Sequence, residues 1–182
     1  MNLLKKRSLG PSSELMDRGL KVYSLIEFDS DAPGAIFNEE GVSQWRFRTE
    51  PRRWAWSLRN LIRKPEFVVF DSDGCELLRI RRESRFPPRF EIVQDSRIVG
   101  RIALCSVLRN KYSITLPDHT TWLLRMPLFT VVFRGESDKG SEVWIFVGPP
   151  KVQWNILLDG DGDRLYILSA LAFIHRERWC YG

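Results

Sequence analysis

An apolar run near the end of the chain, LYILSALAFI at residues 165–174, leaves few options for the fold. At 100° per residue its large side chains point in every direction around a helix, and a helix without a hydrophilic side must be enclosed by protein or by lipid. A bilayer requires about 20 apolar residues, whereas this run ends after ten at His175. We therefore predict a helix over about residues 163–179 that is enclosed by the rest of the chain and forms its core.

The chain before this run has the pattern of short strands. In the segment Glu76–Arg82, Leu78 and Ile80 share one face, while Arg79 and Arg81 share the other. A period of two is typical of a strand with one buried and one solvated face. Asp-Gly at residues 73–74, between two such segments, is a strong hairpin signal.

We predict about eleven or twelve strands, and residues 54–63 fit a strand or a helical turn. Repeated short strands with turns between them are typical of a sandwich or a barrel. At 182 residues and 43% hydrophobic composition, we expect one domain at residues 21–182 after a flexible basic tail at residues 1–20. The segments predicted as strands are 22–28, 42–48, 66–70, 76–82, 89–94, 98–104, 107–116, 121–126, 128–134, 142–147 and 152–158.

Five stretches of the sequence carry a resemblance to a known family: FVVFDSDGCELLRIRRE, FEIVQDSRIVGRI, LRNKYSI, VWIFVGPPKVQWNILL and DGDGDRLYILSALAFIHRERW. They resemble the tubby C-terminal-like superfamily, in its phospholipid scramblase and LURP-one-related branch. The similarity covers about residues 21–182 and lies in the order of the elements and in the terminal helix. It implies a mainly β fold of the α+β class, a closed antiparallel barrel of about 12 strands around a central, buried C-terminal hydrophobic helix.

Three aspartates, Asp159, Asp161 and Asp163, precede the predicted helix. Counted from Asp159 as an EF-hand loop, positions 6 and 12 are Arg164 and Ala170, which lack the required glycine and bidentate glutamate. The resemblance places the calcium-binding segment of the scramblase branch here, but the spacing in this chain is shorter. We expect a turn with Asp163 as helix cap and no metal site; calcium binding is the alternative.

Positive charge is concentrated in the middle of the chain. Residues 46–111 contain 16 Lys/Arg and 8 Asp/Glu, whereas the segments before and after are slightly acidic. Arginine predominates, and its guanidinium fork suits phosphate and carboxylate groups. A solvated basic face without a ligand is the other interpretation. The residues that we expect to bind anionic lipid headgroups are Arg79, Arg81, Arg82, Arg85, Arg89, Arg97 and Arg101.

The sequence gives no support for catalysis, and we expect neither an enzyme nor a cofactor. His119 lies in a predicted turn without an accompanying nucleophile. His175 is interpreted as the point where the helix returns to water. A set of Ser169, His175 and Asp163 would bury the serine in the core, so we discard it.

We therefore expect a non-enzymatic, scramblase-like module that binds an anionic phospholipid surface through its arginine-rich face. The alternative is a nucleic-acid-binding or protein-interaction module that uses the same basic surface, with Trp54, Trp56 and Phe86 as stacking partners; without a recognised motif we do not expect nucleic acid as the partner. Three widely spaced cysteines and the absence of a signal-peptide pattern favour the cytoplasm, with a peripheral position at the inner membrane surface.

Overall fold

A computed structural model of the chain describes residues 19–26, 33–50, 66–84, 86–106, 110–126, 132–148, 153–159 and 164–180, without the side chains of 178–180. These ranges contain twelve strands followed by one helix. The elements are β1 (Lys21–Ile26), β2 (Gly34–Asn38), β3 (Ser43–Glu50), β4 (Glu66–Phe70), β5 (Glu76–Ser84), β6 (Arg89–Gln94), β7 (Arg97–Ser106), β8 (Lys111–Thr115), β9 (Thr121–Arg125), β10 (Val132–Ser137), β11 (Glu142–Gly148), β12 (Gln153–Leu158) and α2 (Arg164–Cys180).

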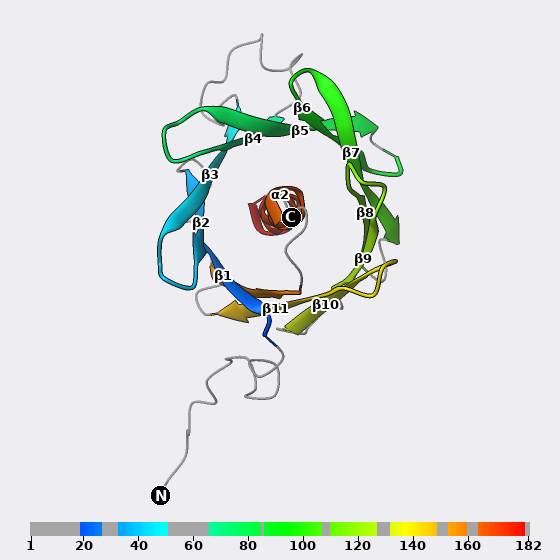
Figure 1. Cartoon of the computed structure of the whole chain (residues 1–182). Coiled ribbons are helices and arrows are strands. Elements are labelled where there is room, and N and C mark those ends of the chain that lie inside the picture. The colour runs from blue at the N-terminus through cyan, green and yellow to red at the C-terminus, as the bar shows by residue number, and fades with distance from the viewer. Residues whose placement is uncertain are drawn as a thin grey trace, which may run out of the picture.

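The twelve strands form a closed barrel around α2, as predicted (Figure 1). Each strand pairs antiparallel with the strands before and after it in sequence, and β1 pairs with β12 to close the ring. This closing ladder runs from Lys21 opposite Leu158 to Ile26 opposite Gln153. Closure leaves no strand edge unpaired, which removes the tendency of an open sheet to aggregate.

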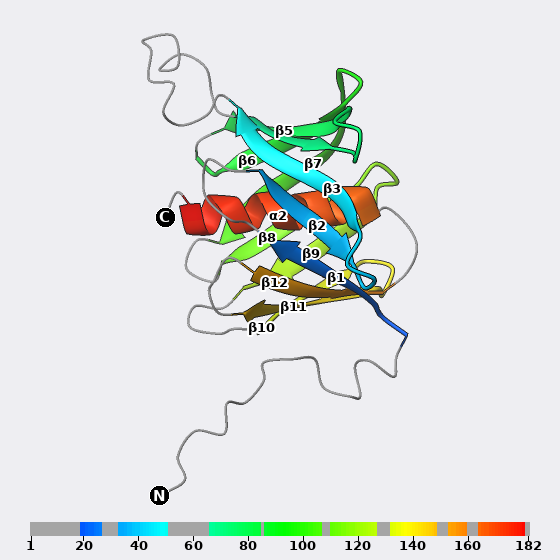
Figure 2. The same cartoon turned by 90° about the vertical axis from the view of Figure 1, so that its left-hand side faces the viewer.

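The two ends of the barrel differ. At one end, which we call the hairpin end, short turns join β2 to β3, β4 to β5, β6 to β7, β8 to β9 and β10 to β11. The helix begins at this end and runs along the barrel axis to the opposite end, which we call the far end (Figure 2). Tyr166 marks the hairpin end, because its hydroxyl donates to Oε1 of Gln94 at the end of β6.

The helix α2 is the core of the protein. Every residue from Ile167 to Arg176 is buried, so the helix has no solvent-exposed side, as the sequence predicts. Phe173 packs against two wall residues, with ring centroids 5.7 Å from Phe67 and 4.6 Å from Phe90. Among the described residues, no helix combines the length and the hydropathy needed to cross a bilayer.

The predicted Asp-Gly hairpin between β4 and β5 is confirmed. Oδ1 of Asp71 accepts hydrogen bonds from the backbone N–H groups of Asp73 and Cys75, at 3.0 and 2.8 Å. Gly74 has a φ of +86°, a conformation that side chains rarely tolerate. The local sequence therefore fixes the reversal that aligns the arginines of β5 with the residues of β4.

Three details differ from the sequence predictions or lie beyond them. The strand β2 was not predicted, because PGAIFN at residues 33–38 is too short and too rich in turn formers to show alternation. Residues 54–63 lie outside the described residues. Leu20, the last residue of the predicted tail, is only 7% exposed and packs with Phe146 and Leu157 on the outside of the barrel.

The helix does not return to water at His175, which corrects the interpretation from sequence. His175 and Arg176 are both 1% exposed. The His175 ring lies edge-on to Trp154, with centroids 4.6 Å apart, and the Arg176 guanidinium lies 5.9 Å from the Phe47 ring centre. Aromatic side chains of the barrel wall therefore contact the polar side chains of the helix inside the far end of the barrel.

Candidate functional site

Arg79 and Arg81 lie together on the outer face of β5, as the sequence predicts. They alternate with Leu78 and Ile80, which are buried in the barrel core. Because side chains alternate along a strand and Leu78 and Ile80 face the core, the guanidinium groups of Arg79 and Arg81 lie on the outer face.

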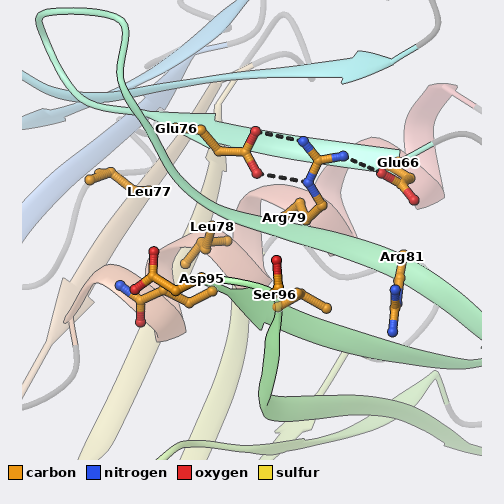
Figure 3. A pocket seen from close by; sticks show the side chains of 10 residues that line it. Glu66, Glu76, Leu77, Leu78, Arg79, Arg81, Asp95 and Ser96 are labelled. Carbon is orange, nitrogen blue, oxygen red and sulfur yellow. Dashed lines mark hydrogen bonds and ion pairs between the residues drawn. The ribbon is translucent and has the colours of Figure 1, made fainter.

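Arg79 is neutralised by two glutamates (Figure 3). Its Nε and Nη2 donate to the carboxylate of Glu76 at 2.7 and 2.5 Å, and its Nη1 donates to Glu66 at 2.5 Å. The hydrogen bonds from Arg79 hold the pKa of Glu76 below its usual value. The hydrogen bond with Glu76 raises the pKa of Arg79 above its already high value. This cluster contains two negative charges and one positive charge.

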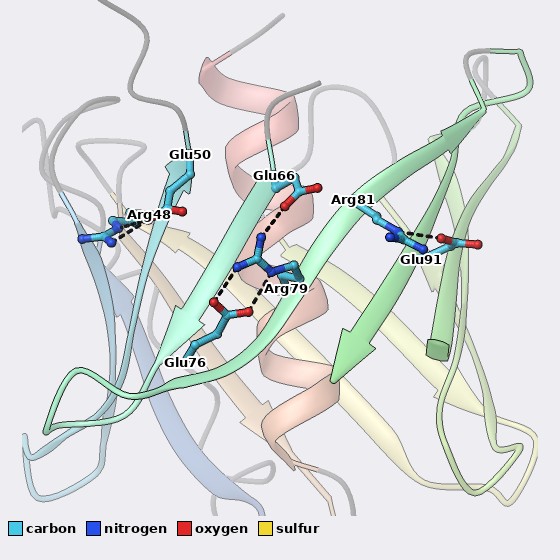
Figure 4. Close-up of polar contacts among 7 residues, drawn as sticks. All are labelled: Arg48, Glu50, Glu66, Glu76, Arg79, Arg81 and Glu91. Carbon is cyan, nitrogen blue, oxygen red and sulfur yellow. Dashed lines mark hydrogen bonds and ion pairs between the residues drawn. The ribbon is translucent and has the colours of Figure 1, made fainter. Parts of the chain in front are cut away.

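Arg81 has a carboxylate partner as well, since its Nε donates to Oε2 of Glu91 on β6 at 2.8 Å. Figure 4 also shows an ion pair between Arg48 and Glu50, which both belong to β3. Opposite charges on neighbouring strands stabilise a sheet by up to about 1 kcal/mol a pair. These contacts therefore explain Arg79 and Arg81 as parts of the outer surface without any ligand.

A groove of about 520 Å³ lies over β5, beside these ion pairs (Figure 3). The charged groups in its lining are Glu66, Glu76, Arg79, Arg81 and Asp95, which give three negative charges against two positive ones. A groove with this balance does not favour an anion. The central part of the predicted arginine face is therefore mixed in charge.

Arg82 does not lie on this face. Its Nη2 lies 3.2 Å from Oε2 of Glu177 on α2, and its guanidinium lies 5.3 Å from the ring centre of Phe90. In a strand that alternates strictly, Arg82 follows Leu78 and Ile80 toward the interior. Arg85 lies outside the described residues.

Arg89, Arg97 and Arg101 are exposed, and within the described ranges none of their side chains forms a hydrogen bond or an ion pair. Arg101 lies opposite Glu91 in the β6–β7 ladder, but Glu91 is held by Arg81. The structure thus divides the predicted set into neutralised arginines on β5 and unneutralised arginines on β6 and β7.

Phe86, which precedes β6, is the most exposed large apolar residue that the structure describes, at 91%. It lies at the far end of the barrel, three residues before Arg89. Single exposed apolar side chains are common on protein surfaces, so Phe86 points to an interaction surface only together with the basic residues near it in sequence.

The structure also reveals a basic row that the sequence analysis missed. Lys111 of β8 lies opposite Arg125 of β9, and Arg125 lies opposite Arg134 of β10. We call these three residues the β8–β10 row. No motif links residues so far apart in sequence, and only the register of the strands brings them together.

The described residues hold no group of three or more His, Cys, Asp or Glu side chains that could bind a metal ion. Asp159 is exposed, whereas Asp161 and Asp163 lie outside the described residues. His119 lies in the exposed turn between β8 and β9 with a φ of +65°, the kind of position that was predicted for it.

Comparison with known proteins identifies the architecture. A scan against protein-family models finds no match, and a search of curated proteins finds none. Among solved structures, the X-ray structure of a protein from Arabidopsis thaliana, AT5G01750, is similar, with 10% sequence identity and a TM-score of 0.58. The match covers 85% of this chain and 88% of that chain. At this identity the likeness shows the fold alone: a closed twelve-stranded barrel around a C-terminal helix.

Proposed function

We propose that this chain is a non-enzymatic module that binds anionic phospholipid surfaces, and that it belongs to the tubby C-terminal-like superfamily, in the scramblase and LURP-one-related branch. The order of elements, the buried terminal helix and the stretches that resemble that branch support the family assignment. Its place is the cytoplasm, at the inner surface of a membrane.

The observation that carries the lipid proposal is the combination of Phe86 and Arg89. One is a 91% exposed aromatic side chain, and the other is an exposed arginine without an ion-pair partner among the described residues. An apolar group enters the interface of a bilayer while nearby basic groups meet the headgroups. Each basic residue close to an anionic membrane contributes about 1 kcal/mol.

A further basic stretch of the sequence follows β3, whose last residue lies at the far end of the barrel. Residues 51–65 contain five Lys/Arg and no Asp/Glu. They lie outside the described residues. The strand before them, β3, ends at the far end, and the strand after them, β4, begins there, where Glu50 pairs with Glu66. Phe86 lies at this end as well.

Vesicle flotation tests the proposal. We expect the protein to float with phosphatidylcholine vesicles that contain phosphatidylserine and to remain unbound with phosphatidylcholine alone. The double variant Arg89→Gln/Arg101→Gln removes two unneutralised charges, so its partition coefficient should fall about 30-fold. The charge-neutral variant Arg79→Gln/Glu76→Gln is the matched control and should bind as the parent does.

Equal binding to neutral and anionic vesicles at low salt would refute the proposal. The alternative, nucleic-acid binding through the same arginines, predicts affinity for DNA or RNA that falls steeply with salt. Binding to nucleic acid without binding to anionic vesicles would replace the lipid function by that alternative.

A further inference from the structure

The β8–β10 row places three cations side by side on the outside of the barrel. Lys111, Arg125 and Arg134 come from three neighbouring strands and lie directly opposite one another in the ladders. Each alternates with a residue buried in the core or packed against it, namely Tyr112, Leu124 and Phe133. All three side chains therefore leave the sheet on its outer face.

This arrangement is electrostatically unfavourable in the free protein. Residues directly opposite in an antiparallel ladder have Cβ atoms about 5 Å apart, and like charges there are destabilising. Arg134 is held by Glu142 and lies over the ring of Trp144, 5.2 Å from its centre. The side chains of Lys111 and Arg125 have no ion pair or hydrogen bond within the described residues.

The contrast with β5 and β6 indicates that the row is not an ordinary solvated surface. There, Arg79 and Arg81 are matched by Glu66, Glu76 and Glu91. Among the described residues, the carboxylates in the next cross-strand row are Glu142 of β11, which is engaged with Arg134, and Glu136 of β10, which lies opposite Leu123. Lys111 and Arg125 therefore keep positive charge of the kind that is neutralised at Arg79 and Arg81 on β5.

We propose that the β8–β10 row is a binding site for a phosphate monoester dianion. The guanidinium of Arg125 offers two parallel N–H donors to two phosphate oxygens, and Lys111 adds a point charge on one side. Arg134 completes the site from the other side, fixed in place by Glu142 and Trp144. The bound dianion removes the repulsion between the three cations. This inference does not rest on the membrane function proposed above.

The first test measures binding and stability in solution. Inorganic phosphate is titrated at constant ionic strength, with chloride as the balancing ion, and the arginine side-chain N–H signals are followed by NMR. We expect the signals of Arg125 and Arg134 to shift, and phosphate to raise the melting temperature by mass action. The variant Arg125→Gln should bind phosphate about tenfold more weakly, because a charge-assisted contact is lost.

Arg125→Gln should also melt at a higher temperature than the parent in chloride, since it removes the repulsion at the centre of the row. A rise in the melting temperature distinguishes a binding site from an arginine with a structural role, because loss of a structural arginine lowers the melting temperature. Lys111→Gln should behave in the same way and provides a second variant. The matched control is Arg46→Gln, which removes the same charge from an exposed arginine of β3 and should retain phosphate binding.

The second test identifies the carrier of the phosphate. Vesicles with phosphatidic acid present a monoester phosphate, and vesicles with phosphatidylserine at equal surface charge present a diester. If Arg125→Gln loses the preference for phosphatidic acid, the ligand is borne by a lipid. If it loses only the binding of soluble phosphate, the ligand is a soluble phosphomonoester. Phosphate affinity that is unchanged in Arg125→Gln and Lys111→Gln, or weakened equally in Arg46→Gln, would overturn the proposal.

Discussion

Arg82 in the wall of the barrel and Glu177 near the end of the enclosed helix form an ion pair, with Nη2 and Oε2 3.2 Å apart. The pair joins two elements 95 residues apart in sequence. Burial raises the pKa of Glu177 above its usual value, and Arg82 offsets only part of this effect. The ion pair therefore fixes the position of the helix end relative to β5, but removing the Glu177 carboxylate from water costs free energy.

This relationship predicts a pH-dependent stability with a defined sign. A carboxyl whose pKa is raised in the folded protein holds its proton more tightly there than in the unfolded chain, so its contribution to stability falls as pH rises through the raised pKa. The variant Glu177→Gln should remove that fall and should be at least as stable as the parent at pH 7. The free energy of unfolding of both proteins, measured by urea titration from pH 4 to pH 8, checks this.

Arg82→Gln is the companion variant for this pH prediction. It removes the favourable partner of Glu177, so it should be less stable than the parent at pH 7 and recover at acidic pH. A difference in stability between the parent and Glu177→Gln that grows in favour of the parent as pH rises would contradict the prediction.

The enclosed helix should not tolerate charge. Leu171 is 0% exposed, and an aspartate there would place an unpaired carboxylate inside the barrel at a cost of several kcal/mol. Because domains of this kind are stable by only about 5–15 kcal/mol, we expect Leu171→Asp to give no cooperative unfolding transition. Ile98→Asp, at a residue 48% exposed on β7, is the control and should unfold cooperatively. A soluble Leu171→Asp protein with a sharp transition would contradict the assignment of the core.

Close strand packing at Gly100 should make replacement of this glycine destabilising. A Cβ atom there would lie 2.6 Å from the carbonyl oxygen of Thr115 and 3.2 Å from a methyl group of Ile92. Since the backbone of β8 cannot yield without breaking its ladder, Gly100→Ala should lower the free energy of unfolding by about 1–3 kcal/mol. At Gly148 the nearest such contact is 3.7 Å, so Gly148→Ala should be nearly neutral. Equal melting temperatures for the two variants would show that the strands adapt.

Membrane docking by the far end predicts a specific role for Phe86. Burying a phenylalanine side chain contributes about 1.5–3 kcal/mol, so Phe86→Ala should weaken binding to anionic vesicles at least about tenfold. The loss should be the same at low and high salt, because it is apolar in origin. Val42→Ala changes an apolar residue 55% exposed at the hairpin end and should have no effect. Equal losses for both variants in sedimentation with vesicles would exclude this orientation.

The sequence predicted the core better than the surface. A helix that is apolar all round must be enclosed, so LYILSALAFI implied that the chain surrounds it, and the alternating segments before it indicated that strands do so. The burial of His175 and Arg176 was not foreseen, because polar residues normally mark the end of an enclosed segment, whereas here Trp154 and Phe47 receive them.

Surface charge could not be predicted in the same way, because its effect depends on strand register. The alternation in β5 correctly placed Arg79 and Arg81 together, but it carried no information about Glu66 and Glu91 on the neighbouring strands. Conversely, Lys111, Arg125 and Arg134 are isolated residues in the sequence. They become neighbours only through two ladders, so neither composition nor local pattern points to them.

The ladder between β1 and β12 has a consequence for how the protein folds. The strand β1 cannot complete its pairing until β12 has been synthesised, and α2, which fills the interior, is synthesised after both. During synthesis the growing sheet has open edges and no core to wrap, a situation that favours slow folding and assistance by chaperones. A protein truncated before residue 164 would keep all the strands of the barrel wall and still fail to fold.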